Sequence, residues 1–161
     1  MQYYVYQNGE KIKTVDNAKT IVITGLKANT KYDFSVSAFN GLRESAKSNV
    51  VSVTTSAIPT TAITLSIPAG IELGQNITAK ITLTPPETTD TVSYKSSDAT
   101  IATIGSDGAI KPLKTGKVTF TATASSGKSA TADVTIYEAL VDVKNLAASN
   151  VNPTGVTLTW E

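Results

Sequence analysis

Residues 20–41 have the sequence TIVITGLKANTKYDFSVSAFNG, which predicts two β-strands joined by a tight corner. From Lys31 to Phe39 apolar and polar residues alternate, as in a strand with one buried face. Residues 25–30, GLKANT, contain the glycine and asparagine that favour turns. This stretch therefore predicts an all-β fold, with strands at Thr20–Thr24 and at Lys31–Phe39.

The residues on either side extend the same pattern. Asn8 and Gly9 lie between two alternating runs, and this dipeptide is a strong signal for a two-residue hairpin turn because both positions tolerate positive φ. A last strand is predicted near Asn49–Thr55. The first part of the chain, residues 1–56, is thus expected to contain about five strands.

Residues 20–41 resemble the E strand, E–F corner and F strand of a fibronectin type III domain, and SNVVSVTT, residues 48–55, resembles its closing G strand. Leu26 and Tyr32 occupy the places of that family's corner leucine and tyrosine. The resemblance implies that the Tyr32 hydroxyl bonds to backbone near the corner. Residues 1–56 would then supply strands C to G, and the opening A and B strands would be missing from this part.

Residues 143–161, VKNLAASNVNPTGVTLTWE, resemble those missing A and B strands, with Trp160 as the family's core tryptophan. Alternation places Val156, Leu158 and Trp160 on one face. We expect two complementary surfaces. The donor strands contribute Leu146, Val151, Val156, Leu158 and Trp160, and the acceptor face contributes Tyr3, Val5, Ile21, Ile23, Leu26, Tyr32, Phe34 and Val36.

Between these pieces, VSYKSSDATIATIGSDGAIKPLKTGKVTFTATASSGKSATADVTI, residues 92–136, resembles the bacterial immunoglobulin-like domain of group 2. We expect that domain at residues 62–137, with linkers at 57–61 and 138–142. GSDG, residues 105–108, is predicted to form a hairpin turn, and Gly116 a loop-to-strand position. The expected strands are Ala62–Leu65, Asn76–Leu83, Thr91–Lys95, Ile101–Ile104, Lys117–Ala124 and Ala130–Tyr137.

The expected fold is all-β, with two immunoglobulin-like β-sandwiches, one of them assembled from the N-terminal and C-terminal pieces. Burying the five donor side chains at roughly 2 kcal/mol each contributes on the order of 10 kcal/mol before entropy. Domain stability is only about 5–15 kcal/mol, so the acceptor piece is expected to need its donor. The donor could come from a neighbouring chain, giving a head-to-tail filament, or from the same chain, as in an engineered circular permutant; short linkers favour the filament. The order of the pieces also fits a cut within a B–C loop of a longer tandem array.

The composition argues against several classes of function. The formal net charge is +1 and no basic run occurs, which argues against nucleic-acid binding. The chain has no cysteine and no histidine, so thiolate and imidazole chemistry and the usual zinc ligands are absent. No apolar run reaches the roughly 20 residues of a membrane span. Any export signal is expected to lie outside this piece.

Few side chains suggest chemistry. Asp98 and Asp107 are interpreted as turn formers, although calcium binding would use such oxygen ligands. Asp133 and Glu138 are interpreted as solvated charges rather than a catalytic pair. Tyr3, Tyr4 and Tyr6 could stack on a sugar, with one or two of them pointing inward. No catalytic, metal or cofactor-binding residue is predicted.

The leading interpretation is a non-enzymatic assembly module of a bacterial surface protein, such as an S-layer or adhesin array, or of a phage virion. Its partner would be the chain itself, with a cell-wall or host-surface glycan as a further possibility, and it would be extracellular. The alternative is a carbohydrate-binding or spacer region of a secreted polysaccharide hydrolase. Fold alone does not decide between them.

Overall fold

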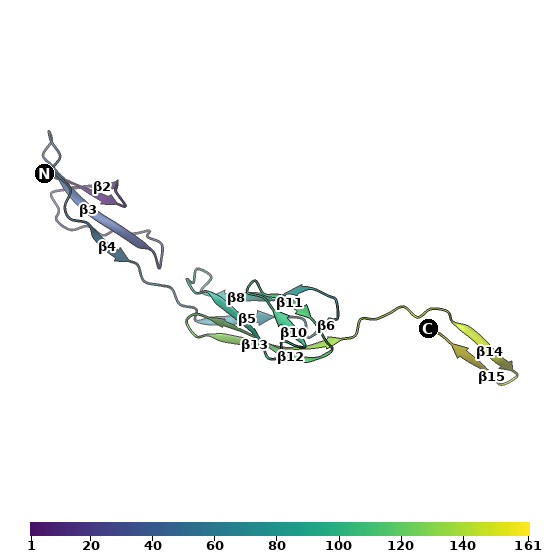
Figure 1. Ribbon diagram of the computed structural model, residues 1–161. Coiled ribbons are helices and arrows are strands. Elements are labelled where there is room, and N and C mark those ends of the chain that lie inside the picture. Colours follow the sequence, from purple (N-terminus) through teal and green to yellow (C-terminus); the bar gives the residue numbers. More distant parts are fainter. The chain divides into compact units, whose positions relative to one another are not determined.

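The computed structural model describes residues 1–161 and contains strands and no helix (Figure 1). The all-β prediction is therefore confirmed, and no helix in the structure could span a membrane. The residues form two units. The first comprises Met1–Ile63, Thr82–Thr91 and Ala124–Lys128, and the second comprises Thr64–Ile81, Val92–Thr123 and Ser129–Glu161.

The first unit contains an antiparallel sheet of four strands in the order β2-β1-β3-β4. The strands are β1 (Gln2–Gln7), β2 (Glu10–Asp16), β3 (Lys31–Phe39) and β4 (Val51–Thr54). Asn8 and Gly9 join β1 to β2 with φ values of 51° and 88°, which confirms the predicted hairpin turn. The long predicted strand at Lys31–Phe39 is also confirmed.

Thr20–Thr24 does not form a strand, so that prediction was wrong. The alternation behind it persists, because Ile21 and Ile23 are half-buried while Val22 is 76% exposed. A strand needs a neighbour for its backbone N–H and C=O groups, and residues 18–26 make no hydrogen bond. The segment thus has the side-chain pattern of a strand but no pairing partner.

Three further groups of strands follow. One sheet has the order β10-β11-β7, a second has the order β6-β13-β12-β9, and β5 pairs with β8. Their bounds are β5 (Ala62–Ser66), β6 (Gly70–Glu72), β7 (Ile77–Thr78), β8 (Lys80–Thr84), β9 (Val92–Ser96), β10 (Ala102–Ile104), β11 (Ala109–Pro112), β12 (Gly116–Ala124) and β13 (Ser129–Tyr137).

The core of the second unit lies between the inner faces of these sheets. Alternate residues of β12 are buried, and Phe120 at its centre has 0% of its surface exposed. Ile136 of β13, Ile71 of β6 and Ile110 of β11 are also fully buried. These side chains come from two sheets, as in a β-sandwich.

Several local predictions hold in this region and others do not. Gly105–Gly108 forms a turn closed by a hydrogen bond from the Gly108 N–H to the Gly105 carbonyl, 3.0 Å, and β12 begins at Gly116. The strand expected at Asn76–Leu83 is instead split, with β7 pairing with β11 and β8 pairing with β5. The short strands β6 and β11 were not predicted.

Hydrogen bonds fix much of the segment expected as a linker, residues 57–61. The Ile58 carbonyl accepts from the Thr89 N–H at 2.8 Å, and the Thr60 N–H donates to the Asp90 carboxylate at 2.7 Å. Thr60 is only 2% exposed. The Asp90 carboxylate also accepts from the hydroxyls of Ser125, at 2.8 Å, and Ser126. One carboxylate thus joins three chain segments.

The Asp90 cluster predicts a pH dependence of stability. Hydrogen bonds from Ser126 and from the Thr60 backbone hold the pKa of Asp90 well below its ordinary value of 3.8. Because the folded pKa is lowered, the stabilisation is complete above the ordinary pKa and is lost as the pH falls through the folded value. We expect Asp90→Asn to flatten the fall in the unfolding midpoint between about pH 5 and pH 2. Urea titrations at each pH would measure the unfolding midpoint. A midpoint that falls as steeply with pH in Asp90→Asn as in the parent chain would contradict the assignment.

Candidate functional site

The four-stranded sheet of the first unit has one apolar face. Opposed residues in an antiparallel pair lie on the same face, and the register pairs Tyr3 with Ala38 and Val5 with Val36. Alternation along β3 adds Tyr32 and Phe34. Their partners on β4, Val53 and Val51, extend the face, as does Val15, the partner of Tyr3 on β2. We call these nine residues the acceptor face.

The acceptor face is incompletely covered. Val5 and Tyr32 are buried, whereas Val36 is 38% exposed and Val51 and Val53 are more exposed still. An exposed apolar patch on an ordered sheet is typical of an interaction surface. Five of the residues expected from the sequence, Tyr3, Val5, Tyr32, Phe34 and Val36, lie on this face.

The other three expected acceptor residues belong to the segment between β2 and β3. Ile21, Ile23 and Leu26 are half-buried there. The Lys27 N–H donates to the Tyr32 hydroxyl at 2.9 Å, which confirms the predicted bond from tyrosine back to the corner. This bond ties the end of the segment to β3.

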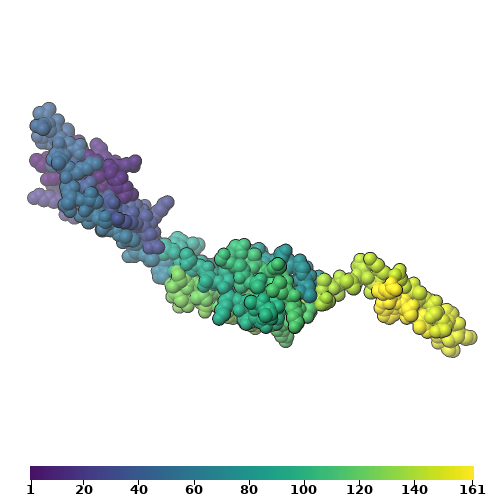
Figure 2. All heavy atoms as spheres, viewed as in Figure 1, coloured from purple at the N-terminus to yellow at the C-terminus, as the bar shows by residue number.

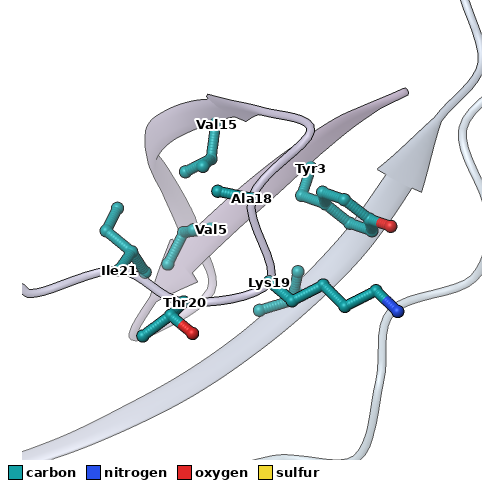
Figure 3. A pocket seen from close by; sticks show the side chains of 8 residues that line it. Tyr3, Val5, Val15, Ala18, Lys19, Thr20 and Ile21 are labelled. Carbon is teal, nitrogen blue, oxygen red and sulfur yellow. The ribbon is translucent and has the colours of Figure 1, made fainter.

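A hollow of about 330 Å³ opens between this segment and the sheet (Figure 3). Figure 3 shows Ala18, Lys19, Thr20 and Ile21 on a stretch of chain that passes over the strands carrying Tyr3, Val5 and Val15. Together with Val36, these residues line the hollow. Of the lining residues, sequence reasoning missed Val15, Ala18, Lys19 and Thr20. The pairing of Val15 with Tyr3 depends on an irregularity between Val5 and Tyr6 that shifts the register of β1 on β2.

The opposite face of the sheet is polar and carries the remaining tyrosines. Tyr6 donates to the Glu44 carboxylate, which also accepts from the Ser37 hydroxyl at 2.6 Å. These hydrogen bonds, that from Ser37 first, lower the pKa of Glu44. The Lys47 ammonium lies 3.8 Å from the centre of the Tyr6 ring. Tyr6 therefore contacts the loop that follows β3, through Glu44 and Lys47, whereas Tyr3 lies on the acceptor face.

Tyr4, the third tyrosine considered for sugar stacking, lies on the polar face too. Its ring stacks on Phe39 with centroids 5.3 Å apart, and the Lys11 ammonium lies 4.1 Å from its centre. One of the three tyrosines thus points to the acceptor face and two point away, which fits the expectation that one or two face inward.

The last part of the chain is a two-stranded hairpin, β14 (Ala147–Asn152) and β15 (Gly155–Thr159), drawn in yellow in Figure 2. Backbone bonds between Lys144 and Glu161, of 2.7 and 2.9 Å, extend the pair by one rung. Every residue from Tyr137 to Glu161 is exposed. The two terminal pieces expected to form one sandwich are thus present as a four-stranded sheet and a solvent-exposed hairpin.

All five expected donor residues lie in or beside this hairpin. Leu158 pairs with Ala148, and alternation places Val156 and Trp160 on the same face as Leu158. Leu158 is 49% exposed and Trp160 is 62% exposed. Leu146 and Val151 are more exposed than either. We call the face of Val156, Leu158 and Trp160 the donor face.

The carboxylates considered for calcium or catalysis have local partners. Asp98 accepts from the N–H and the hydroxyl of Thr100 at 2.8 and 2.6 Å, and these bonds lower its pKa. Asp107 accepts from the Ala109 N–H at 3.0 Å, and Asp133 from the Thr119 hydroxyl at 2.6 Å. No group of three acidic residues that could hold a metal ion occurs among residues 1–161. Asp98 and Asp107 are turn formers, as predicted.

Comparison with known proteins identifies the sandwich. Residues 59–134 match the family model described as the bacterial Ig-like domain (group 2). Residues 59–134 are thus similar to a bacterial Ig-like domain, and we call this region the bacterial Ig-like domain. The match begins at Pro59, so the bacterial Ig-like domain includes Thr60, whose N–H binds Asp90.

One curated relative is 3-O-alpha-D-galactosyl-alpha-L-arabinofuranosidase of Bifidobacterium longum subsp. longum, 37% identical over 73 residues. The match covers 44% of this chain but only 6% of that enzyme. Among solved structures, the S-layer protein rSbsC is 19% identical with a TM-score of 0.45, over 91% of this chain and 21% of that one. A glycosyl hydrolase family 2 member from Bacteroides cellulosilyticus is 15% identical with a TM-score of 0.35, over 84% and 21%.

Proposed function

We propose that this chain is a non-catalytic structural module of an extracellular bacterial protein, in which the hairpin of one copy covers the acceptor face of the next. The observation that carries the proposal is the pair of exposed apolar surfaces at the two ends of the sequence. The acceptor face is only partly covered, and the donor face packs on nothing in its own unit. The bacterial Ig-like domain between them would act as a spacer.

The backbone supports the same pairing. Residues 18–26 make no hydrogen bond, so the segment Thr20–Thr24 has free N–H and C=O groups. β15 is also five residues long and is paired on one side only, with β14. A free strand edge can add to another chain by backbone hydrogen bonding, with alternate side chains setting the register. An isolated two-stranded hairpin is marginal in water, so the donor gains stability as well.

The intermolecular arrangement is favoured over closure within one chain. Closure needs a reversal at each linker, residues 57–61 and residues 138–142. In the first of these, Ile58, Thr60 and Thr61 are hydrogen-bonded to residues 84–90. Each copy then offers one donor and one acceptor, and such a contact continues from copy to copy unless a rotation closes it. The completed sheet pair would be a fibronectin type III sandwich assembled from two chains.

A concentration series tests the proposal. We expect sedimentation velocity to show a ladder of multiples of the chain mass that lengthens with concentration. Leu158→Asp, which places a charge on the donor face, is expected to abolish the ladder, because burying an unpaired carboxylate has a large free-energy cost. Thr159→Asp, on the opposite face of β15, is the matched control and should leave it. A strictly monomeric parent chain would refute the proposal.

A second setting is a spacer within a secreted glycoside hydrolase. The observation favouring it is the 37% identity over 73 residues to an arabinofuranosidase. We propose a non-catalytic role in that setting as well; the matched residues cover only 6% of that enzyme. The two settings differ in what the module supports rather than in how its copies join.

A further inference from the structure

We propose that the solvent-facing side of the sheet β6-β13-β12-β9 binds a neutral glycan, with Tyr137 as the surface on which one sugar ring packs. Two hollows on this sheet adjoin at Tyr137, which lines both of them. We call the two hollows together the Tyr137 site. The site lies within the second unit and uses neither the acceptor face nor the donor face, so it does not depend on the proposed joining of copies.

Outward-facing residues of β12 and β13 form the floor of the first hollow. The register places Lys117 opposite Thr135 on this face. The next outward pair is Thr119 with Asp133. Beside them the Ser97 hydroxyl accepts from the Thr119 N–H at 2.9 Å. With the tyrosine, these side chains line a hollow of about 480 Å³, which is within the range of roughly 300–1,000 Å³ for small-molecule sites.

Contacts with β6 hold Tyr137 in place. β13 pairs in parallel with β6, and the Leu73 N–H donates to the Tyr137 carbonyl at 2.9 Å. The ring lies against Gly70, because a Cβ added to that glycine would be 2.8 Å from Cε2 of the ring. The other side of the ring is open, and Tyr137 is 56% exposed. The tyrosine therefore presents an aromatic surface from a fixed backbone position.

The polar groups around this ring suit a sugar. A pyranose has a C–H face that packs on an aromatic ring and a rim of hydroxyls that donate and accept hydrogen bonds. The Asp133 carboxylate can accept, the Lys117 ammonium can donate, and the Thr135 hydroxyl can do both. No carboxylate lies within ion-pair distance of Lys117, and Asp133 uses one of its two oxygens, for the Thr119 hydroxyl at 2.6 Å. Lys117 and the second Asp133 oxygen are thus free to bind sugar hydroxyls.

The charges favour a neutral glycan over an anionic one. In the first hollow the charge of Lys117 balances that of Asp133. The second hollow, of about 620 Å³, is lined by Glu72 and Glu138 and by no cation. These two carboxylates would repel a uronate or phosphate group. A neutral chain that crosses Tyr137 would instead donate hydrogen bonds from its hydroxyls to carboxylates in both hollows, and such charge-assisted bonds are the stronger ones.

A peptide fits the Tyr137 site less well than a glycan. An extended peptide adds to a sheet at an edge strand whose backbone groups are free. β12 and β13 are interior strands with neighbours on both sides, so the floor of the site has no free backbone edge. The neighbouring edge strand β6 is only three residues long. Binding there must use side chains, which sugar hydroxyls and a C–H face can engage.

Affinity gel electrophoresis of the full chain tests the glycan site. Each gel would contain one neutral polysaccharide, either xyloglucan, galactomannan or glucomannan, or the anionic polymer polygalacturonate. We expect retardation in at least one neutral gel and none in polygalacturonate. Tyr137→Ala should weaken the binding at least tenfold because it removes the aromatic surface, whereas Tyr137→Trp should retain binding. Gly70→Ala should weaken binding several-fold, because the added methyl group displaces the ring.

Two substitutions on the same face of the sheet are the matched controls. Thr131 is on β13 and Lys95 is on β9, and both are exposed and lie outside the two hollows. Thr131→Ala and Lys95→Met should therefore leave binding unchanged. Lys117→Met, inside the first hollow, should weaken it several-fold. Lys117→Met and Gly70→Ala test the position of the site even if Tyr137→Ala does not fold.

Each contrary result overturns a stated part of the inference. Retardation in polygalacturonate alone would overturn the neutral ligand. Retardation that persists unchanged in Tyr137→Ala and Lys117→Met would overturn the position of the site, and no retardation in any gel would overturn the site itself. Sedimentation velocity of Tyr137→Ala should give the same ladder as the parent chain. Failure of glycan binding therefore leaves the proposed joining of copies standing, and failure of joining leaves the glycan site standing.

Discussion

Phe120→Ala is expected to lower the free energy of unfolding of the bacterial Ig-like domain by about 3–5 kcal/mol. Phe120 is fully buried at the centre of β12, so its removal loses the transfer free energy of the ring and leaves a cavity. Domains of this kind are stable by about 5–15 kcal/mol. The variant should therefore unfold at much lower urea concentration and, at the lower end of that range, be largely unfolded.

Thr121→Ala is the control for Phe120→Ala. Thr121 is the next residue of β12 and points to the opposite face, where its register partner is Thr131. Its replacement should change stability by less than about 1 kcal/mol. Urea denaturation followed by far-ultraviolet circular dichroism measures both variants. Equal midpoints for Phe120→Ala and Thr121→Ala would show that the core is not centred on β12.

Deleting residues 143–161 is expected to abolish association altogether, because the deletion removes the whole donor face. The shortened chain keeps its acceptor face, so it should act as a terminator when mixed with the intact chain. An equimolar mixture should give shorter ladders than the intact chain alone at the same total concentration. Sedimentation velocity measures both effects.

Adding residues 143–161 back as a separate peptide distinguishes loss of the donor from general damage. The peptide should bind the shortened chain one to one and raise the urea midpoint of its first unit. It should not restore the ladder, because donor and acceptor are then on different molecules. A shortened chain that still forms ladders would place the contact elsewhere on the module.

Local signals in the sequence predicted local structure well. Asn8-Gly9 predicted a hairpin because the dipeptide itself accommodates positive φ, and both residues adopt it. The turn at residues 105–108 and the start of β12 at Gly116 were predicted for similar reasons. Lys31–Phe39 has nine alternating residues, which is enough for an unambiguous strand.

Pairings between distant residues could not be predicted in this way. β6 is three residues long and pairs in parallel with β13, more than sixty residues later, so no local pattern marks it. The strand predicted at Thr20–Thr24 is missing because side-chain alternation does not supply a neighbouring backbone. The hollow was also beyond prediction, because it depends on how Ala18–Ile21 passes over the sheet.

The bonds that hold residues 58–61 have a mechanical consequence. Ser56 and Thr55 are still tied to the corner before β3, and Ile58 is already tied to Thr89. Only Ala57 between them has no hydrogen bond. A pulling force that enters through β4 is therefore transmitted through one residue without hydrogen bonds before it reaches Ile58. The force then falls on the bonds at Thr89 and Asp90. In a chain of joined copies under tension, the strength of this junction would depend on a few hydroxyl groups and one carboxylate.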